Sequence, residues 1–254
     1  MVRIIPLLFL AVMVGLAQQP APSDPKPKFD VASVKLGDPN VRGGFQYRPE
    51  AGQFTATSAT LSQLLAFAYD VRRFQLLGGP KWRDSTAFTI DAKAEKPIVS
   101  DAKGREIFQL MLQDVLAERF HLVAHRETRN DRIYELIIDK GGSKMVENTA
   151  LGGGIHMRAN QLRGTAAPMF LLVNQLSQAV GRKVVDRTGL QSKYDFVVEW
   201  QPDSPTFGQE PQATSDAPTS IFTALREGAG LQLKSATGPV DYIIIDKLEK
   251  PDEN

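Results

Sequence analysis

Residues 194–200, Tyr-Asp-Phe-Val-Val-Glu-Trp, show the cleanest alternation of apolar and polar side chains in the sequence. A period of two places every second side chain on the same face of a strand, so this stretch predicts a half-buried β-strand. Residues 88–92, Phe-Thr-Ile-Asp-Ala, alternate in the same way about one chain half earlier. The other elements of the fold can be predicted from their positions before and after these two strands.

Helical patterns lie before and after each of these strands. Thr60 and Gln63 have the spacing of a capping box at the start of the first helix. Pro168 stands where the first turn of a helix tolerates proline. The apolar positions with helical spacing are Leu61, Leu64, Leu65 and Ala68; Ile107, Leu110, Met111, Val115 and Leu116; Met169, Leu172, Val173, Leu176 and Val180; and Ile221, Phe222 and Leu225.

Each half is expected to end in a β-hairpin. The polar residues 129–132, Arg-Asn-Asp-Arg, predict a turn between strand segments 120–127 and 133–139. Residues 235–238, Ser-Ala-Thr-Gly, predict a second turn between the apolar segments on either side.

The order of these predicted elements therefore occurs twice. It predicts an α+β fold of two similar units, each with helices covering one face of a mixed sheet, and an internal duplication of the chain. The alternative is that helices and strands alternate by chance, as in any α+β protein. The units are expected over residues 29–147 and 148–254.

Residues 1–17 have the features of a secretory signal peptide. Arg3 precedes a stretch that is uncharged from Ile4 to Ala17. A membrane anchor is the alternative, but a span requires about 20 apolar residues, and the polar Gln18 follows at once. We therefore expect a periplasmic or secreted protein that keeps no stable membrane span after the signal is cleaved.

Two proline-containing segments are expected to lie outside the folded units. Residues 18–28 contain four prolines, which favour an extended leader. Residues 202–218 combine proline with Ser, Thr, Gln and Gly, and have too few apolar side chains to fold alone. We expect an exposed loop there.

Composition excludes several classes of function. The chain has 30 Lys and Arg against 29 Asp and Glu, so a mature chain without Arg3 would be neutral. Nucleic-acid binding requires clustered positive charge, and nucleic acid is therefore not an expected partner. The chain contains no cysteine, which excludes disulfides and thiol catalysis.

Six short stretches carry a resemblance to a known family. They are residues 29–35 (Phe-Asp-Val-Ala-Ser-Val-Lys), 78–82 (Gly-Gly-Pro-Lys-Trp), 116–120 (Leu-Ala-Glu-Arg-Phe), 125–129 (His-Arg-Glu-Thr-Arg), 185–190 (Val-Asp-Arg-Thr-Gly-Leu) and 250–254 (Lys-Pro-Asp-Glu-Asn). In these stretches the chain resembles a large paralogous family of exported proteins of unknown function from soil Acidobacteria of the Solibacter type. The resemblance implies export and brings no activity with it.

A second, looser resemblance concerns the end of each half. Residues 225–233, Leu-Arg-Glu-Gly-Ala-Gly-Leu-Gln-Leu, followed by residues 242–245, are similar to the end of the short N-terminal domain of secretins and TonB-dependent receptors. Residues 116–122 form a similar ending without the glycine. This resemblance implies a module that docks proteins.

His121, His125 and Glu127 form the candidate metal site. On an extended backbone these three side chains would point to the same face, and two imidazoles with a carboxylate can bind zinc. A zinc-protease helix would instead place its two histidines one turn apart with the Glu between them. The alternative is a sheet face with solvated polar groups.

Two further motifs have a functional and a structural interpretation. Trp82 is a candidate for a ligand groove, and packing against a core is its alternative. Residues 186–189, Asp-Arg-Thr-Gly, are predicted to form a tight turn, in which the Asp side chain accepts backbone hydrogen bonds.

The expected function is a non-catalytic periplasmic or secreted module that binds an envelope protein or peptide, without a cofactor. A metal-dependent hydrolase of envelope or extracellular polymers, using His121, His125 and Glu127, is one alternative. A small-molecule carrier with a groove near Trp82 is another.

Overall fold

The computed structural model describes residues 27–38, 40–41, 43–158, 160–200 and 220–251. The expected signal peptide (residues 1–17), most of the leader (residues 18–28) and the expected loop (residues 202–218) lie outside the described residues. The described part has four α-helices and three four-stranded sheets, which confirms the predicted α+β class. None of its helices is both long enough and apolar enough to cross a membrane.

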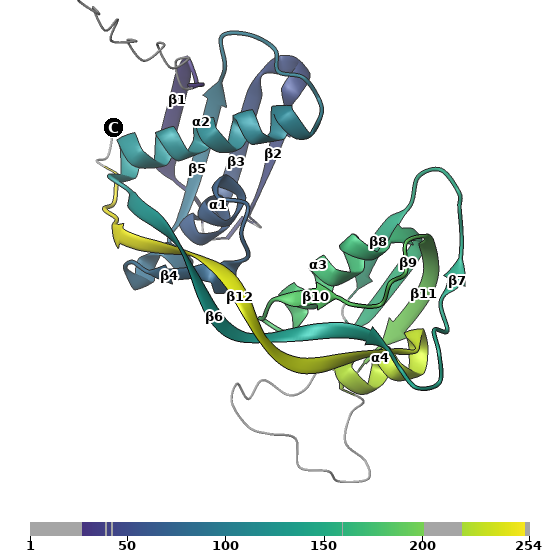
Figure 1. Cartoon of the computed structure of the whole chain (residues 1–254). Coiled ribbons are helices and arrows are strands. Elements are labelled where there is room, and N and C mark those ends of the chain that lie inside the picture. The colour runs from purple at the N-terminus through teal and green to yellow at the C-terminus, as the bar shows by residue number, and fades with distance from the viewer. Residues whose placement is uncertain (1–26, 39, 42, 159, 201–219, 252–254) are drawn as a thin grey trace, which may run out of the picture.

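The first unit is an antiparallel sheet with two helices on one face (Figure 1). Its sheet has the order β1-β5-β3-β2, and the predicted alternation is confirmed because Phe88, Ile90 and Ala92 of β5 are buried. Its elements are β1 (Val31–Leu36), β2 (Gly44–Arg48), η1 (Pro49–Ala51), β3 (Gln53–Thr60), α1 (Leu61–Ala68), β5 (Ala87–Lys93) and α2 (Ala102–Phe120), with the short 3-10 helices η2 (Arg73–Gln75) and η3 (Lys81–Asp84) between α1 and β5.

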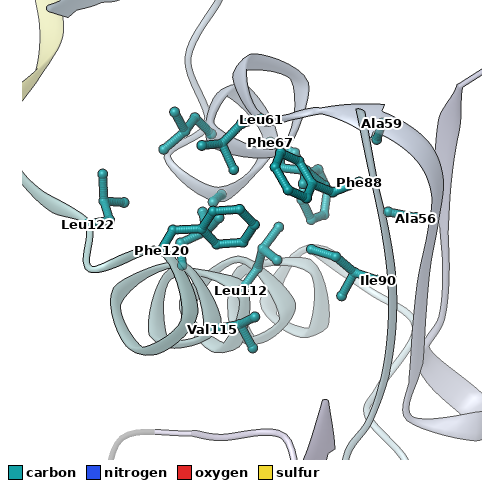
Figure 2. Packing of buried hydrophobic residues seen from close by; sticks show 14 of the residues in the cluster. Ala56, Ala59, Leu61, Phe67, Phe88, Ile90, Leu112, Val115, Phe120 and Leu122 are labelled. Carbon is teal, nitrogen blue, oxygen red and sulfur yellow. The ribbon is translucent and has the colours of Figure 1, made fainter. Parts of the chain in front are cut away.

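The sequence accounts for the start of α1 and for the core beneath it. The predicted capping box forms, since Thr60 accepts a hydrogen bond from the backbone N–H of Gln63 and donates its own N–H to the Gln63 side chain. Figure 2 shows apolar side chains from α1, α2 and the sheet filling the space between them. The rings of Phe88 and Phe120 meet edge to face with centroids 5.0 Å apart, a favoured aromatic geometry.

The second unit repeats this construction with a sheet in the order β7-β11-β9-β8. Tyr194, Phe196 and Val198 of β11 are all buried, as their alternation predicted. The predicted turn at Asp186 is confirmed, because its carboxylate accepts the backbone N–H of Thr188. The elements are β7 (Val146–Glu147), β8 (Gly154–Arg158), β9 (Gln161–Pro168), α3 (Met169–Ala179), β11 (Lys193–Glu199) and α4 (Ile221–Ala229).

The third sheet joins the two units. Its two long strands show that the prediction of two hairpins is wrong. Residues 129–132 and 235–238 are not turns: each lies inside one long strand, β6 (Val123–Ile138) or β12 (Leu231–Lys247). These strands pair antiparallel with each other along their length, so the partner strand supplies the backbone hydrogen bonds that a local hairpin would have made. Figure 1 shows them as one twisted ribbon with a unit at each end.

Each unit also contributes a short strand to the long strand of the other unit. β4 (Leu76–Gly78) of the first unit runs parallel to β12, and β10 (Val184–Asp186) of the second runs parallel to β6. Leu76 lies opposite Ile243, and Val184 lies opposite Tyr134. The central sheet therefore has the order β10-β6-β12-β4, in which the two units interlock.

The pairing of β6 with β12 has an approximate twofold symmetry. A shift of 109 residues takes Tyr134 to Ile243, and these two residues hold equivalent places against β10 and β4. The same shift makes Asn130 equivalent to its own partner, Pro239, so the approximate twofold axis passes through that pair. The order of strands and helices repeats from β1–β6 to β7–β12, while an origin by duplication stays a prediction. β7, at the end of the expected first unit, pairs with β11 of the second.

The strand that precedes the first helix of each unit has the same irregularity. Ser58 and Ala166 both have positive φ, at 45° and 40°. The backbone N–H of Ser58 donates to Thr89 Oγ1 at 3.3 Å, and that of Ala166 donates to Asp195 Oδ1 at 2.7 Å. A side chain of the neighbouring strand thus replaces the backbone acceptor that the distortion removes.

Candidate functional site: a groove between the two units

The predicted metal residues do not lie around a common point. His121 has φ 48° and ends α2 in the left-handed conformation, so it lies outside the strand on which the prediction placed it. Its Nδ1 is 3.3 Å from Glu249, whereas His125 Nδ1 is 2.8 Å from Asp246. The extended backbone assumed for all three residues is therefore wrong at the first of them.

Glu127, the third residue of that set, is bound by another partner. Its carboxylate accepts two hydrogen bonds from the Arg129 guanidinium, at 2.8 and 2.7 Å, and these bonds lower the pKa of Glu127 below its usual range. Within the described ranges, no group of three or more His, Asp or Glu side chains is close enough to hold a metal ion. A metal site at these residues stays a prediction.

Trp82 lies in η3 and packs against the core of the first unit. Its ring meets Phe88 edge-on, with centroids 6.1 Å apart, and the Lys250 ammonium lies 5.8 Å from the ring centroid. The indole is half-buried and does not line the groove described next. The position of Trp82 therefore agrees with the alternative interpretation, packing against a core.

A groove of about 1220 Å³ lies between α1 of the first unit and α3 of the second, beside the central sheet. Figure 1 shows these two helices on the sides of the units that face each other. The lining includes side chains from both units and from β12. The long ribbon therefore positions two walls that come from distant parts of the sequence.

The first wall combines aromatic rings with charged side chains. Phe45, which is 36% exposed, packs on Phe67 with ring centroids 4.7 Å apart. The Arg105 guanidinium lies 5.9 Å from the centroid of Phe67 and forms an ion pair with Asp70 at 2.8 Å. The Arg105 guanidinium and the Phe67 ring thus form a cation–π interaction at the surface of this wall.

The loop after α1 extends the first wall and is bound to β12 of the central sheet by a hydrogen bond. Gln75 accepts the backbone N–H of Arg72 at 2.9 Å, and its own side-chain amide donates to the carbonyl oxygen of Asp241 at 2.7 Å. Arg73 forms an ion pair with Asp84 at 3.3 Å. Arg72 and Arg73 both line the groove.

The second wall is apolar and amide-rich. α3 buries Leu172 and Leu176 in its own unit and presents Phe170, 61% exposed, to the groove. The remaining lining side chains of this helix include Leu171, Val173, Asn174, Gln175 and Gln178. The charged side chain among the lining residues of the second unit is Lys183, whose Nζ donates to the carbonyl oxygen of Pro239 at 2.7 Å.

A smaller cavity of about 210 Å³ lies against the middle of the ribbon, beside Tyr242 and Asp131. The Tyr242 hydroxyl donates to Asp131 Oδ2 at 2.6 Å. Burial of the phenol, together with this hydrogen bond, raises the pKa of Tyr242 to about 12. Tyr242 therefore stays protonated across the ordinary pH range and acts here as a hydrogen-bond donor.

Sequence reasoning did not find the groove. The residues of its two walls are 65 to 139 positions apart in the chain, and only the unpredicted pairing of β6 with β12 brings them together. Two local signals were present: Phe170 lies off the buried stripe of its helix, and Arg72-Arg73 is a pair of adjacent cations.

The fold and the groove define a class: a two-unit α+β protein whose interlocked halves have a groove between them. The chain belongs to DUF3738, a family described as protein of unknown function, whose model matches residues 62–248. That stretch includes α3 and all of α1 except its first residue, Leu61. No curated protein and no solved structure matches the chain.

Proposed function

We propose that the chain is an exported, non-catalytic module that binds a segment of an envelope protein in the groove between α1 and α3. The observation that carries this proposal is the groove itself, whose volume of about 1220 Å³ exceeds the range of about 300–1,000 Å³ typical of small-molecule pockets. A peptide segment fits that volume better than a metabolite does.

The chemistry of the walls supports the same conclusion. Aromatic side chains and arginines carry most of the binding energy at protein interfaces, and the groove offers exposed Phe170 and Phe45 beside Arg72. The half-buried Gln175 and the exposed Gln178 carry amides that can bond to the backbone of a bound segment. Phe170, Gln175 and Gln178 stand on α3, and Phe45 stands on β2. Both elements are parts of the folded units, which limits the entropy lost on binding.

Selection from a random peptide library displayed on phage, with the purified full chain as bait, tests the binding. Peptides enriched by the chain should lose at least tenfold in affinity to the variant Phe170→Ala, because aromatic anchors of this kind contribute about 2 kcal/mol or more. Leu151→Ala is the matched control, since Leu151 is 98% exposed and lies outside the groove lining. Failure to enrich any peptide would refute the proposal.

Export has its own test. Mass spectrometry of protein recovered from the periplasm or medium of an expressing bacterium should find a mature N-terminus after Ala17. Recovery from the cytosol with residues 1–17 still attached would contradict the export part of the proposal and leave the binding part to the phage selection.

A further inference from the structure

Resting on the proposed function, the geometry points to the chemistry of the ligand: we propose that the groove takes an acidic, amphipathic peptide segment. Its carboxylates would face Arg72 of the first unit and Lys183 of the second, and its apolar side chains would face α3. The inference follows from the unlike chemistry of two walls that the approximate twofold symmetry would otherwise make alike.

Positive charge dominates the titratable groups in the groove. Its lining contains Arg72, Arg73, Arg105 and Lys183, but only Asp70 and Asp241 as carboxylates. The charges of the lining residues therefore sum to +2, although the chain as a whole is close to neutral. This local excess attracts an anionic ligand and repels a cationic one.

The existing ion pairs identify which cations remain available. Arg105 is paired with Asp70, and Arg73 with Asp84. The Arg72 guanidinium forms no ion pair with any side chain that the structure describes. Lys183 donates to a carbonyl oxygen and forms no ion pair with a carboxylate in the described part of the chain. Arg72 and Lys183 are thus the two groups with most to gain from a ligand carboxylate.

The two cations lie on corresponding loops of the two units. Arg72 precedes η2 and β4, and Lys183 directly precedes β10, so the approximate twofold axis relates the loops that carry them. A segment bound in the groove would thus meet one positive charge from each unit. Phe170 and Leu171 of α3 offer apolar surface for the ligand's other face.

The peptides from the phage selection test this inference directly. Their sequences should contain more Asp and Glu than the unselected library, together with apolar or aromatic residues. A synthetic copy of the most enriched peptide is the probe, and fluorescence polarisation gives its affinity. Replacement of its carboxylates by amides should weaken binding about tenfold, and the loss should shrink as salt rises.

Variants of the chain assign the effect to the two cations. Arg72→Gln and Lys183→Gln should each weaken binding of the acidic probe about 2- to 5-fold, as expected for partly exposed charges, and should leave binding of the amide version nearly unchanged. Arg158→Gln is the matched control, because Arg158 is exposed on β8 and outside the groove lining. Circular dichroism establishes that each variant is folded.

The outcomes separate the two proposals. Acidic peptides that depend on Phe170, Arg72 and Lys183 would support both. Enriched peptides that are neutral or basic, yet lose affinity to Phe170→Ala, would overturn the acidic inference and leave the proposed function standing. No enrichment, or enrichment indifferent to Phe170→Ala, would overturn the proposed function and the inference with it.

Discussion

The interlocking of the two units predicts that they unfold together. Ile243 belongs to the second half of the chain but is 1% exposed in the core of the first unit. Replacement of a buried Ile by Ala costs about 2–5 kcal/mol, from lost burial and the cavity left behind. At an m value of about 3 kcal/mol/M in urea, Ile243→Ala should lower the unfolding midpoint by about 1–2 M.

The chain provides one natural reporter for each unit. Its two tryptophans divide between the cores: Trp82 packs against the first and Trp200 against the second. Trp82→Phe and Trp200→Phe leave one reporter each, so urea titration followed by fluorescence monitors the units separately. If the central sheet couples them, both reporters should give the same midpoint, and Ile243→Ala should shift both by the same amount.

Two results would refute this reasoning. The midpoints from the two reporters could differ in the parent chain, or Ile243→Ala could shift only the Trp82 signal. Val123→Ala is the control, since Val123 lies on the neighbouring long strand but is 53% exposed, and it should shift neither midpoint by more than about 0.3 M.

The remaining predictions concern three local structures. Asp195 has a pKa below its ordinary value because Ala166 N–H and the Asn148 amide bond to its carboxylate. A carboxylate whose pKa is lower in the folded state than in the unfolded state stabilises the fold when it is ionised, so the stability advantage over Asp195→Asn should be full at pH 7 and should shrink as acid titrates the carboxylate. A difference in stability that does not change between pH 7 and pH 3 would contradict the assignment. Tyr242→Phe should lower the free energy of unfolding in urea by about 0.5–1.5 kcal/mol. Because the folded pKa of Tyr242 is raised to about 12, this contribution should be present below pH 10 and lost as pH rises through 12. Ultraviolet titration should show one tyrosine ionising last. Gly164→Ala should destabilise the fold by about 1–3 kcal/mol, because a Cβ there would collide with the ring of Phe196. Gly154→Ala is the control and should change stability little, since open space surrounds Gly154. Equal effects of the two substitutions in thermal unfolding would show that the predicted collision does not occur.

Local patterns predicted the local structure well. The buried faces of β5 and β11, the capping box at Thr60 and the turn at Asp186 each depend on side chains within a few residues of one another. The repeated order of elements followed from these patterns in turn. Such features are specified by periodicity and by side-chain-to-backbone hydrogen bonds, both of which can be read from sequence.

The choice of strand partners could not be predicted in the same way. Residues 129–132 have the composition of a turn, and nothing nearby indicates that they pair with residues more than 100 positions later. Pro239 lies within β12, opposite Asn130, and a proline is tolerated in a strand where its missing N–H is not needed by the ladder. The groove was missed for the same reason, since its walls meet only through this pairing.

The pairing of β4 with β12 also has a consequence for the order of events during synthesis. Leu76 is made long before Ile243, its eventual neighbour, and at about 5–20 residues per second the interval between them is on the order of 10–30 s. Throughout that interval the nascent N-terminal half exposes apolar surface that only the last strand can cover. The N-terminal half therefore stays open to aggregation or to chaperone binding for longer than the first half of a protein whose halves fold one after the other.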